Sequence, residues 1–118
     1  MRFEIYLLVN TLNKELFEEE AETLVNSKLT ALKTISFDEA MKLPRAVPED
    51  IVIAGKEVQL TVFKQSDLED LPDAVLVTLQ VVRAGLGGIL NYQLERGMLY
   101  FPNGDIREAT EKELLATR

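Results

Sequence analysis

The stretch AVLVTLQVVR, residues 74–83, decides how the rest of the sequence is interpreted. It is rich in β-branched and other apolar residues, a composition typical of a strand inside a sheet. A hairpin turn at Ala54-Gly55-Lys56 precedes it, and the glycine-rich segment 85–88 follows it; both are bordered by further apolar segments. We therefore predict an antiparallel meander of about four strands, at roughly 51–54, 57–64, 74–83 and 89–101.

A helical pattern precedes the meander. Between about residues 12 and 33 the apolar residues recur with the 3.6-residue period of a helix that covers a core. The predicted core stripe consists of Phe17, Ala21, Leu24, Val25, Leu32 and Ile35. Lys28 falls on this stripe, so either its alkyl stem lies along the core or the helix ends before it. Residues 2–9 alternate like a strand, but Leu8 breaks the alternation, so strand and helix both remain open for them.

Two capping boxes predict short helices. In a capping box, a hydroxyl residue and an acidic residue three positions later satisfy each other's backbone N–H groups at a helix start. Ser36 and Glu39 have this spacing and predict a helix at about 37–43. Thr110-Glu111-Lys112-Glu113 has it again and predicts a terminal helix at about 110–116.

The end of the chain has the order strand, turn, strand and capped helix. Asn103-Gly104 is a strong signal for a tight turn, and Gly97 inside the last long strand predicts a bulge. Helices come first and strands follow, rather than alternating with them. This order favours one α+β domain over residues 1–118, with the long helix across one face of the sheet.

The composition excludes several classes of function. The 118-residue chain has no histidine and no cysteine, so Ser–His triads, thiol nucleophiles and the usual zinc sites are impossible, and we expect no cofactor. The absence of cysteine and of a signal-peptide pattern favours the cytoplasm. The net charge is −7 without a basic cluster, which disfavours nucleic-acid binding. No apolar run approaches the ~18 residues of a membrane span.

Two further segments invite a ligand-site interpretation. The loop SDLEDLPD carries Asp67, Glu69, Asp70 and Asp73, but its spacing does not match a calcium-binding EF-hand. We interpret it as a solvated connector in which Ser66 caps one helical turn. Gly85-Leu86-Gly87-Gly88 lacks the following helix and the Lys-Ser or Lys-Thr pair of a phosphate loop, so it predicts a turn.

The sheet provides the candidate functional surface. Side chains alternate between the two faces of a strand, and the apolar row of Val58, Leu60, Val62, Val75, Val77, Leu79, Leu90, Tyr92 and Leu94 is predicted to face the helix. The opposite face then lacks charge, although faces exposed to water usually carry Lys, Glu and Arg. Its neutral polar and apolar residues suit an interface. The candidate interface residues are Gln59, Thr61, Phe63, Leu76, Thr78, Gln80, Asn91 and Gln93. An ordinary wet face and a small-molecule cleft are the alternatives.

These features favour an interaction module over an enzyme. We expect it to self-associate, as a homodimer, or to bind one protein partner through the uncharged sheet face. One alternative is a small enzyme that relies on carboxylates or a metal. The other is an acidic inhibitor, either an antidote to a basic toxin or a nucleic-acid mimic that uses the glutamate-rich helix face at 15–22.

Overall fold

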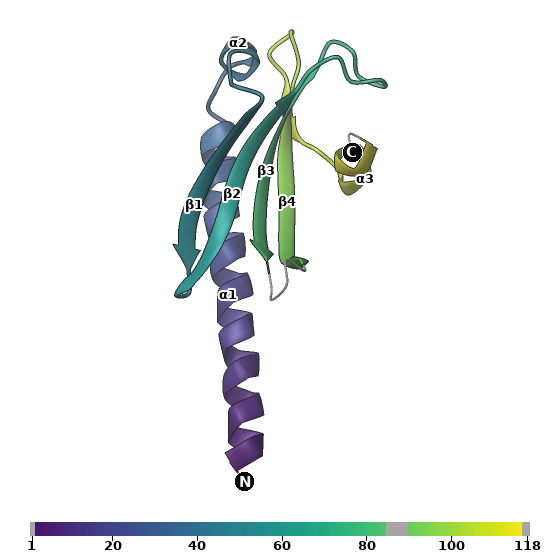
Figure 1. Ribbon diagram of the computed structural model, residues 1–118. Coiled ribbons are helices and arrows are strands. Elements are labelled where there is room, and N and C mark those ends of the chain that lie inside the picture. The colour runs from purple at the N-terminus through teal and green to yellow at the C-terminus, as the bar shows by residue number, and fades with distance from the viewer. Residues whose placement is uncertain (1, 85–89, 117–118) are drawn as a thin grey trace.

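Figure 1 shows the computed structural model of the protein, which describes residues 2–84 and 90–116 and the side chains of residues 14–83 and 92–116. The elements in chain order are α1 (Arg2–Leu32), α2 (Phe37–Met41), β1 (Ala46–Ile53), β2 (Lys56–Gln65), β3 (Val75–Ala84), β4 (Leu90–Tyr100), β5 (Ile106–Glu108) and α3 (Glu111–Ala116).

The strands form one antiparallel sheet in the order β1-β2-β3-β4-β5. Helix α1 lies across one face of this sheet and extends beyond its end (Figure 1), which gives the molecule extents of 61 × 27 × 24 Å. The predicted α+β architecture, a meander packed on a long helix, is confirmed. Within the described part of the chain, no helix has both the length and the apolar character needed to cross a membrane.

Strand β1 is longer than the sequence predicted. Its pairing with β2 begins at Ala46, opposite Phe63, rather than at residue 51. The predicted strand at 51–54 leaves out Pro48, a residue that has no backbone N–H to give to a ladder. Pro48 lies in β1, an edge strand of the sheet. Alternate residues of an edge strand turn their N–H groups away from the sheet, and a proline at such a position costs no ladder hydrogen bond.

Two other features differ from the predictions, and one open alternative is decided. Of the strand and the helix left open for residues 2–9, the structure has the helix, since α1 runs from Arg2 to Leu32. The short strand β5 makes the sheet five-stranded rather than four-stranded. Gly97 is not a bulge, since it pairs in register with Thr78; the register of β3 and β4 shifts between Arg83 and Ala84 instead.

The main core lies between α1 and the sheet. Phe17, Ala21, Val25 and Leu29 form the buried stripe of α1, of which Leu29 was missing from the predicted stripe. On the sheet side, the core consists chiefly of Val58, Leu60, Val75, Val77, Leu79, Val81, Met98 and Tyr100. The helix continues past the half-buried Lys28 to Leu32. The Tyr100 hydroxyl donates to the Leu32 carbonyl over 2.5 Å, which satisfies one of the carbonyls left unpaired at a helix C-terminus.

Both capping boxes are present. The Glu39 N–H donates to Ser36 Oγ, and the Ser36 N–H donates to Glu39 Oε1, each over 3.1 Å. At α3, the Glu113 N–H donates to Thr110 Oγ1 over 3.2 Å, and the Thr110 N–H donates to Glu113 Oε1 over 2.9 Å. The sequence therefore identified the start of both short helices.

A second, smaller core lies on the other face of the sheet. Helix α3 and the loop between β2 and β3 fold over the end of that face and enclose Ala74, Leu76, Leu99, Ala109 and Leu114. The rest of the face is not covered by a helix (Figure 1). We call this uncovered part the open face; its residues are described below.

Candidate protein-binding face

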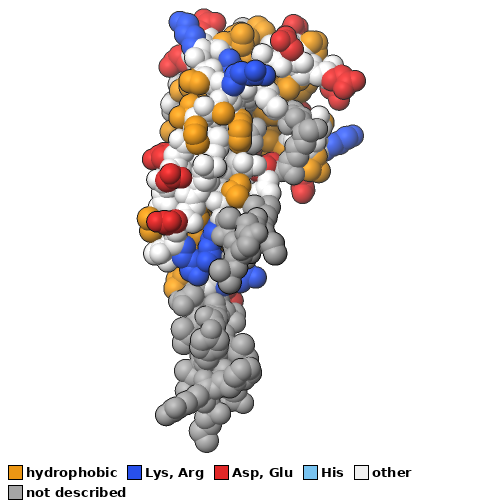
Figure 2. All heavy atoms as spheres, viewed as in Figure 1, with side chains coloured by type: hydrophobic (Ala, Val, Ile, Leu, Met, Phe, Trp, Pro, Cys, Tyr) orange, Lys and Arg blue, Asp and Glu red, His pale blue; other side chains and the backbone are white. Residues whose placement is uncertain are grey.

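The open face is built by the period-two alternation of three neighbouring strands. The strand register forms three rows that cross β2, β3 and β4 in that order: Gln59, Val82 and Gln93; Thr61, Gln80 and Glu95; and Phe63, Thr78 and Gly97. In Figure 2, white and orange side chains fill the middle of this face, and red and blue side chains lie mainly along its margins. The predicted neighbours Gln59, Thr61, Phe63, Thr78, Gln80 and Gln93 are therefore on one surface.

One of the candidate interface residues, Leu76, is buried on that side of the sheet. Leu76 points to the same side of the sheet, but it is only 1% exposed and belongs to the second core with Leu114. The second core therefore buries Leu76 within its own chain, and its part in an interface stays a prediction. The side chain of Asn91 lies outside the described residues.

The open face contains one carboxylate that the sequence analysis missed. Glu95 Oε1 accepts hydrogen bonds from Gln80 Nε2 over 2.7 Å and from Gln93 Nε2 over 2.6 Å. The alternation that placed Gln93 on this face continues to Glu95, so the signal was present in the sequence. The middle of the face is therefore mainly neutral rather than free of charge, and its carboxylate, Glu95, is held between two amides. By the strand alternation, Glu57 on β2 and Asp50 on β1 lie on the same side of the sheet, toward its margin.

The hydroxyl residues in the middle of the face are more buried than their polarity suggests. Thr61 is 6% exposed and Thr78 is 9% exposed, and the longer residues Gln80 and Phe63 lie directly opposite them in the strand register. A partner that approaches here meets the ends of Phe63, Gln59 and Gln80 before it meets a threonine. A partner would therefore contact mainly the aromatic ring of Phe63 and the side-chain amides of Gln59 and Gln80.

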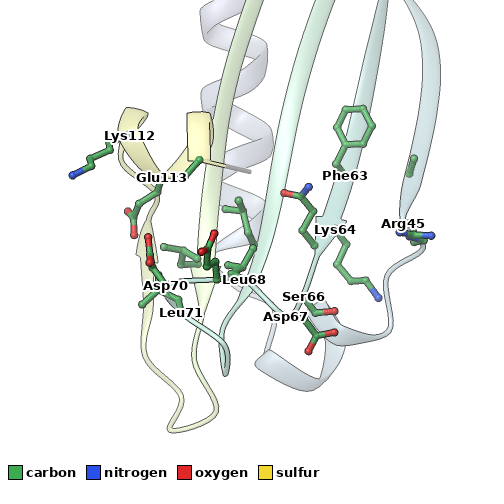
Figure 3. Close-up of a pocket in the computed structure, with 16 residues that line it drawn as sticks. Arg45, Phe63, Lys64, Ser66, Asp67, Leu68, Asp70, Leu71, Lys112 and Glu113 are labelled. Atoms are coloured by element: carbon green, nitrogen blue, oxygen red, sulfur yellow. The ribbon is translucent and has the colours of Figure 1, made fainter. Parts of the chain in front are cut away.

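A groove runs along the boundary between the open face and the second core. Its volume is about 1050 Å³, and its apolar lining comes from Phe63, Leu76 and Leu99 on the strands and from Leu68 and Leu71 on the loop. Figure 3 shows Phe63 on β2 across from α3, with the loop that carries Leu68 and Leu71 at one end. An apolar side chain could therefore enter between the sheet and α3.

Charges of both signs border the groove. Arg45 and Lys112 lie at opposite sides, and Glu69 and Asp70 line the loop. Lys64 also borders it, but its ammonium group donates to the Met41 carbonyl over 3.0 Å and so is engaged at α2. The lining is thus suited to a ligand that has apolar groups and charges of both signs.

The wall formed by α3 is held by an ion pair. Arg107 donates through both terminal nitrogens to the two carboxylate oxygens of Glu113, each over 2.7 Å. This hydrogen bonding, with the bonds from Thr110, lowers the pKa of Glu113 from 4.5 to about 2. The same pairing raises the pKa of Arg107. The charged network therefore fixes the first turn of α3 beside β5.

The acidic loop has a different structure from the one predicted. Residues 66–73 form bends and turns, not a capped helical turn, and Asp67 has a φ of 55° in the left-handed region. Aspartate tolerates this region better than most residues do. Among the described residues, no group of three or more Asp, Glu, His or Cys side chains is arranged to hold a metal ion. The glycine turn at 85–88 lies outside the described residues.

No protein-family model, curated protein or solved structure matches the chain.

Proposed function

We propose that the protein is a binding module that holds a segment of one protein partner in the groove and on the open face. The observation that carries this proposal is the groove itself, a hollow of about 1050 Å³ with an apolar floor around Phe63. Burial of apolar side chains on such a floor supplies binding free energy, and the neighbouring amides supply directed hydrogen bonds. The carboxylate of Glu95 accepts hydrogen bonds from the Gln80 and Gln93 amides, and Gln59 is an exposed amide on the same face.

A different protein suits this surface better than a second copy does. A twofold contact places the same patch of one subunit against itself. Two hollows cannot fill each other, so the groove calls for a protruding segment. Its volume of about 1050 Å³ lies just above the ~300–1,000 Å³ usual for small-molecule clefts, and its mixed charges suit a peptide. We place this binding in the cytoplasm, as the lack of cysteine favours.

The test uses random 12-residue peptides displayed on phage, selected against the wild-type protein. Peptides that bind in the groove should lose affinity on the order of tenfold or more for the Phe63→Lys variant, because a buried and unpaired charge is costly. Val52→Lys is the matched control: Val52 lies on β1, is 67% exposed and does not line the groove.

Thermal melts establish that both variants fold. If selection enriches no peptides, or if the enriched peptides bind Phe63→Lys as tightly as they bind wild type, the groove is not the binding site.

A further inference from the structure

The floor of the groove is built from strands whose backbones are already paired on both sides. All the residues that line the groove belong to the described part of the chain, and the three large apolar strand residues of its floor each have a paired residue on either flank. These pairs are Phe63 with Ala46 and Thr78, Leu76 with Gln65 and Leu99, and Leu99 with Leu76 and Arg107. An extended peptide on this floor would therefore find no strand edge to pair with.

Strand β1, which borders the groove at Ala46, is protected against pairing along its outer edge. Residues of an antiparallel strand turn their backbone N–H and C=O groups alternately toward the two sides of the strand. The Lys64 N–H donates to the Arg45 carbonyl over 3.0 Å, so Ala46 and Pro48 turn outward. A proline at the second of these positions has no N–H to donate, and this discourages the addition of a strand.

These two features determine which backbone conformation suits the groove. Each backbone N–H and C=O group that is buried needs a hydrogen-bond partner. A helix supplies these partners within itself, whereas an extended segment takes them from a neighbouring strand. We propose that the segment held in the groove is an amphipathic helix of the partner, with its apolar face on the floor and its N-terminal turn at the loop between β2 and β3. This inference rests on the proposed function and specifies what the groove holds.

The floor has the chemistry that the apolar face of a helix requires. Leu76 and Leu99 are each 1% exposed, and the partly buried Leu68 and Leu71 of the loop pack against the same core. Phe63, which is also partly buried, lines the groove from β2. Apolar side chains at positions i, i+3, i+4 and i+7 lie on one face of a helix, and such a face docks into hydrophobic grooves. We therefore expect the partner helix to carry this spacing.

The charges around the groove orient the helix. Asp67, Glu69 and Asp70 are exposed on the loop that lines one end, and Arg45 and Lys112 lie at opposite sides (Figure 3). The N-terminus of a helix carries a partial positive charge and unpaired N–H groups, which carboxylates can accept. The N-terminal turn, with basic side chains, therefore fits at the loop. Acidic side chains fit along the sides, beside Arg45 and Lys112.

Two peptide libraries displayed on phage test the conformation. They have equal length and composition, but one carries its apolar residues at i, i+3, i+4 and i+7, and the other carries them in strict alternation, the spacing of a strand. Selection against the wild-type protein should enrich groove-binding peptides, identified by their loss of affinity for Phe63→Lys, from the helical library. In the tightest of them, proline at a central polar position should weaken binding on the order of tenfold or more, because it breaks the helix, whereas serine at that position should have little effect.

The outcomes separate this inference from the proposed function. Groove-binding peptides that come equally from both libraries, or that bind as tightly with the proline, would overturn the helix and leave the groove as the binding site. If no peptide discriminates against Phe63→Lys, the proposed function is refuted, and this inference with it.

The orientation is tested by the position of positive charge. Two versions of the tightest helical peptide carry a pair of lysines either at the N-terminal end or at the C-terminal end. Fluorescence anisotropy should show that the wild-type protein binds the N-terminal version tighter by about threefold, as expected for an exposed ion pair. Asp70→Lys should abolish this preference. Asp73→Lys is the matched control, because Asp73 lies on the same loop but does not line the groove. Thermal melts establish that both variants fold, and an equal preference in Asp70→Lys and wild type would refute the orientation.

Discussion

The Arg107–Glu113 pair makes the stability of α3 dependent on pH. The pKa of Glu113 falls from 4.5 to about 2 on folding, chiefly through the Arg107 hydrogen bonds. A lowered pKa contributes stability above the unfolded value, and this contribution is lost as the pH falls from about 4.5 toward about 2. Arg107 is 46% exposed, so solvent screening limits the effect to ~0.5–1 kcal/mol, as for other surface pairs.

Glu113→Gln isolates the charge, because glutamine can still cap the helix. We expect the variant to be less stable than wild type by ~0.5–1 kcal/mol at pH 7 and the difference to shrink as the pH falls from about 4.5 through about 2. Urea denaturation at several pH values measures the difference, and Glu111→Gln on the same helix is the control. A difference that stays constant across this range would contradict the assignment.

Gly97 determines how closely α3 can pack on the sheet. A Cβ atom at this position would lie 2.9 Å from Leu114 Cδ2 and 3.2 Å from the Val77 carbonyl oxygen. The contact with Leu114 is the shorter, so Leu114 must shift, and the carbonyl, fixed in the ladder of β3, keeps the new methyl group from moving away from it. Gly97→Ala should therefore destabilise the protein by ~1–3 kcal/mol, the usual cost of overpacking.

Denaturation of Gly97→Ala in the wild-type and Leu114→Ala backgrounds tests this explanation. The cost of Gly97→Ala should shrink when Leu114 is truncated, since neighbouring residues do not contribute additively. An equal cost in both backgrounds would show that the contact with α3 is not the cause.

Elements with a strong local signal were predicted well. The capping boxes at Ser36 and Thr110 and the β-branched strands require only neighbouring residues to be recognised. The extent of β1 was missed because Pro48 is acceptable only on an outward edge position, and strand order is not a local property. Gly97 was misread for a similar reason: its partner Leu114 is distant in sequence and reaches it only when α3 folds back.

The same limit applies to the candidate site. Period-two alternation placed Gln59, Thr61 and Gln80 on one face, because it depends only on backbone geometry. It could not show that α3 covers Leu76, nor that the loop and α3 enclose a groove beside Phe63. Those features arise from packing between segments that are separated in the sequence and meet only in the folded structure.

The placement of the two cores on opposite faces of one sheet predicts two levels of stability. The main core includes α1 and the long strands, whereas the second core depends on the six-residue α3 and a loop. Regions with few buried contacts open at lower free energy than the global unfolding transition. Leu114→Ala should therefore release α3 and expose the second core while the main core stays folded.

Hydrogen exchange followed by mass spectrometry distinguishes local opening from global unfolding. In Leu114→Ala, peptides covering residues 106–116 should lose protection by on the order of tenfold or more, while peptides covering 75–82 keep theirs. Leu60→Ala is the contrasting variant, since Leu60 is buried in the main core. Its cavity should lower protection in both regions, because α3 cannot stay docked on an unfolded sheet. Uniform loss of protection in Leu114→Ala would instead mean that the two cores unfold as one unit.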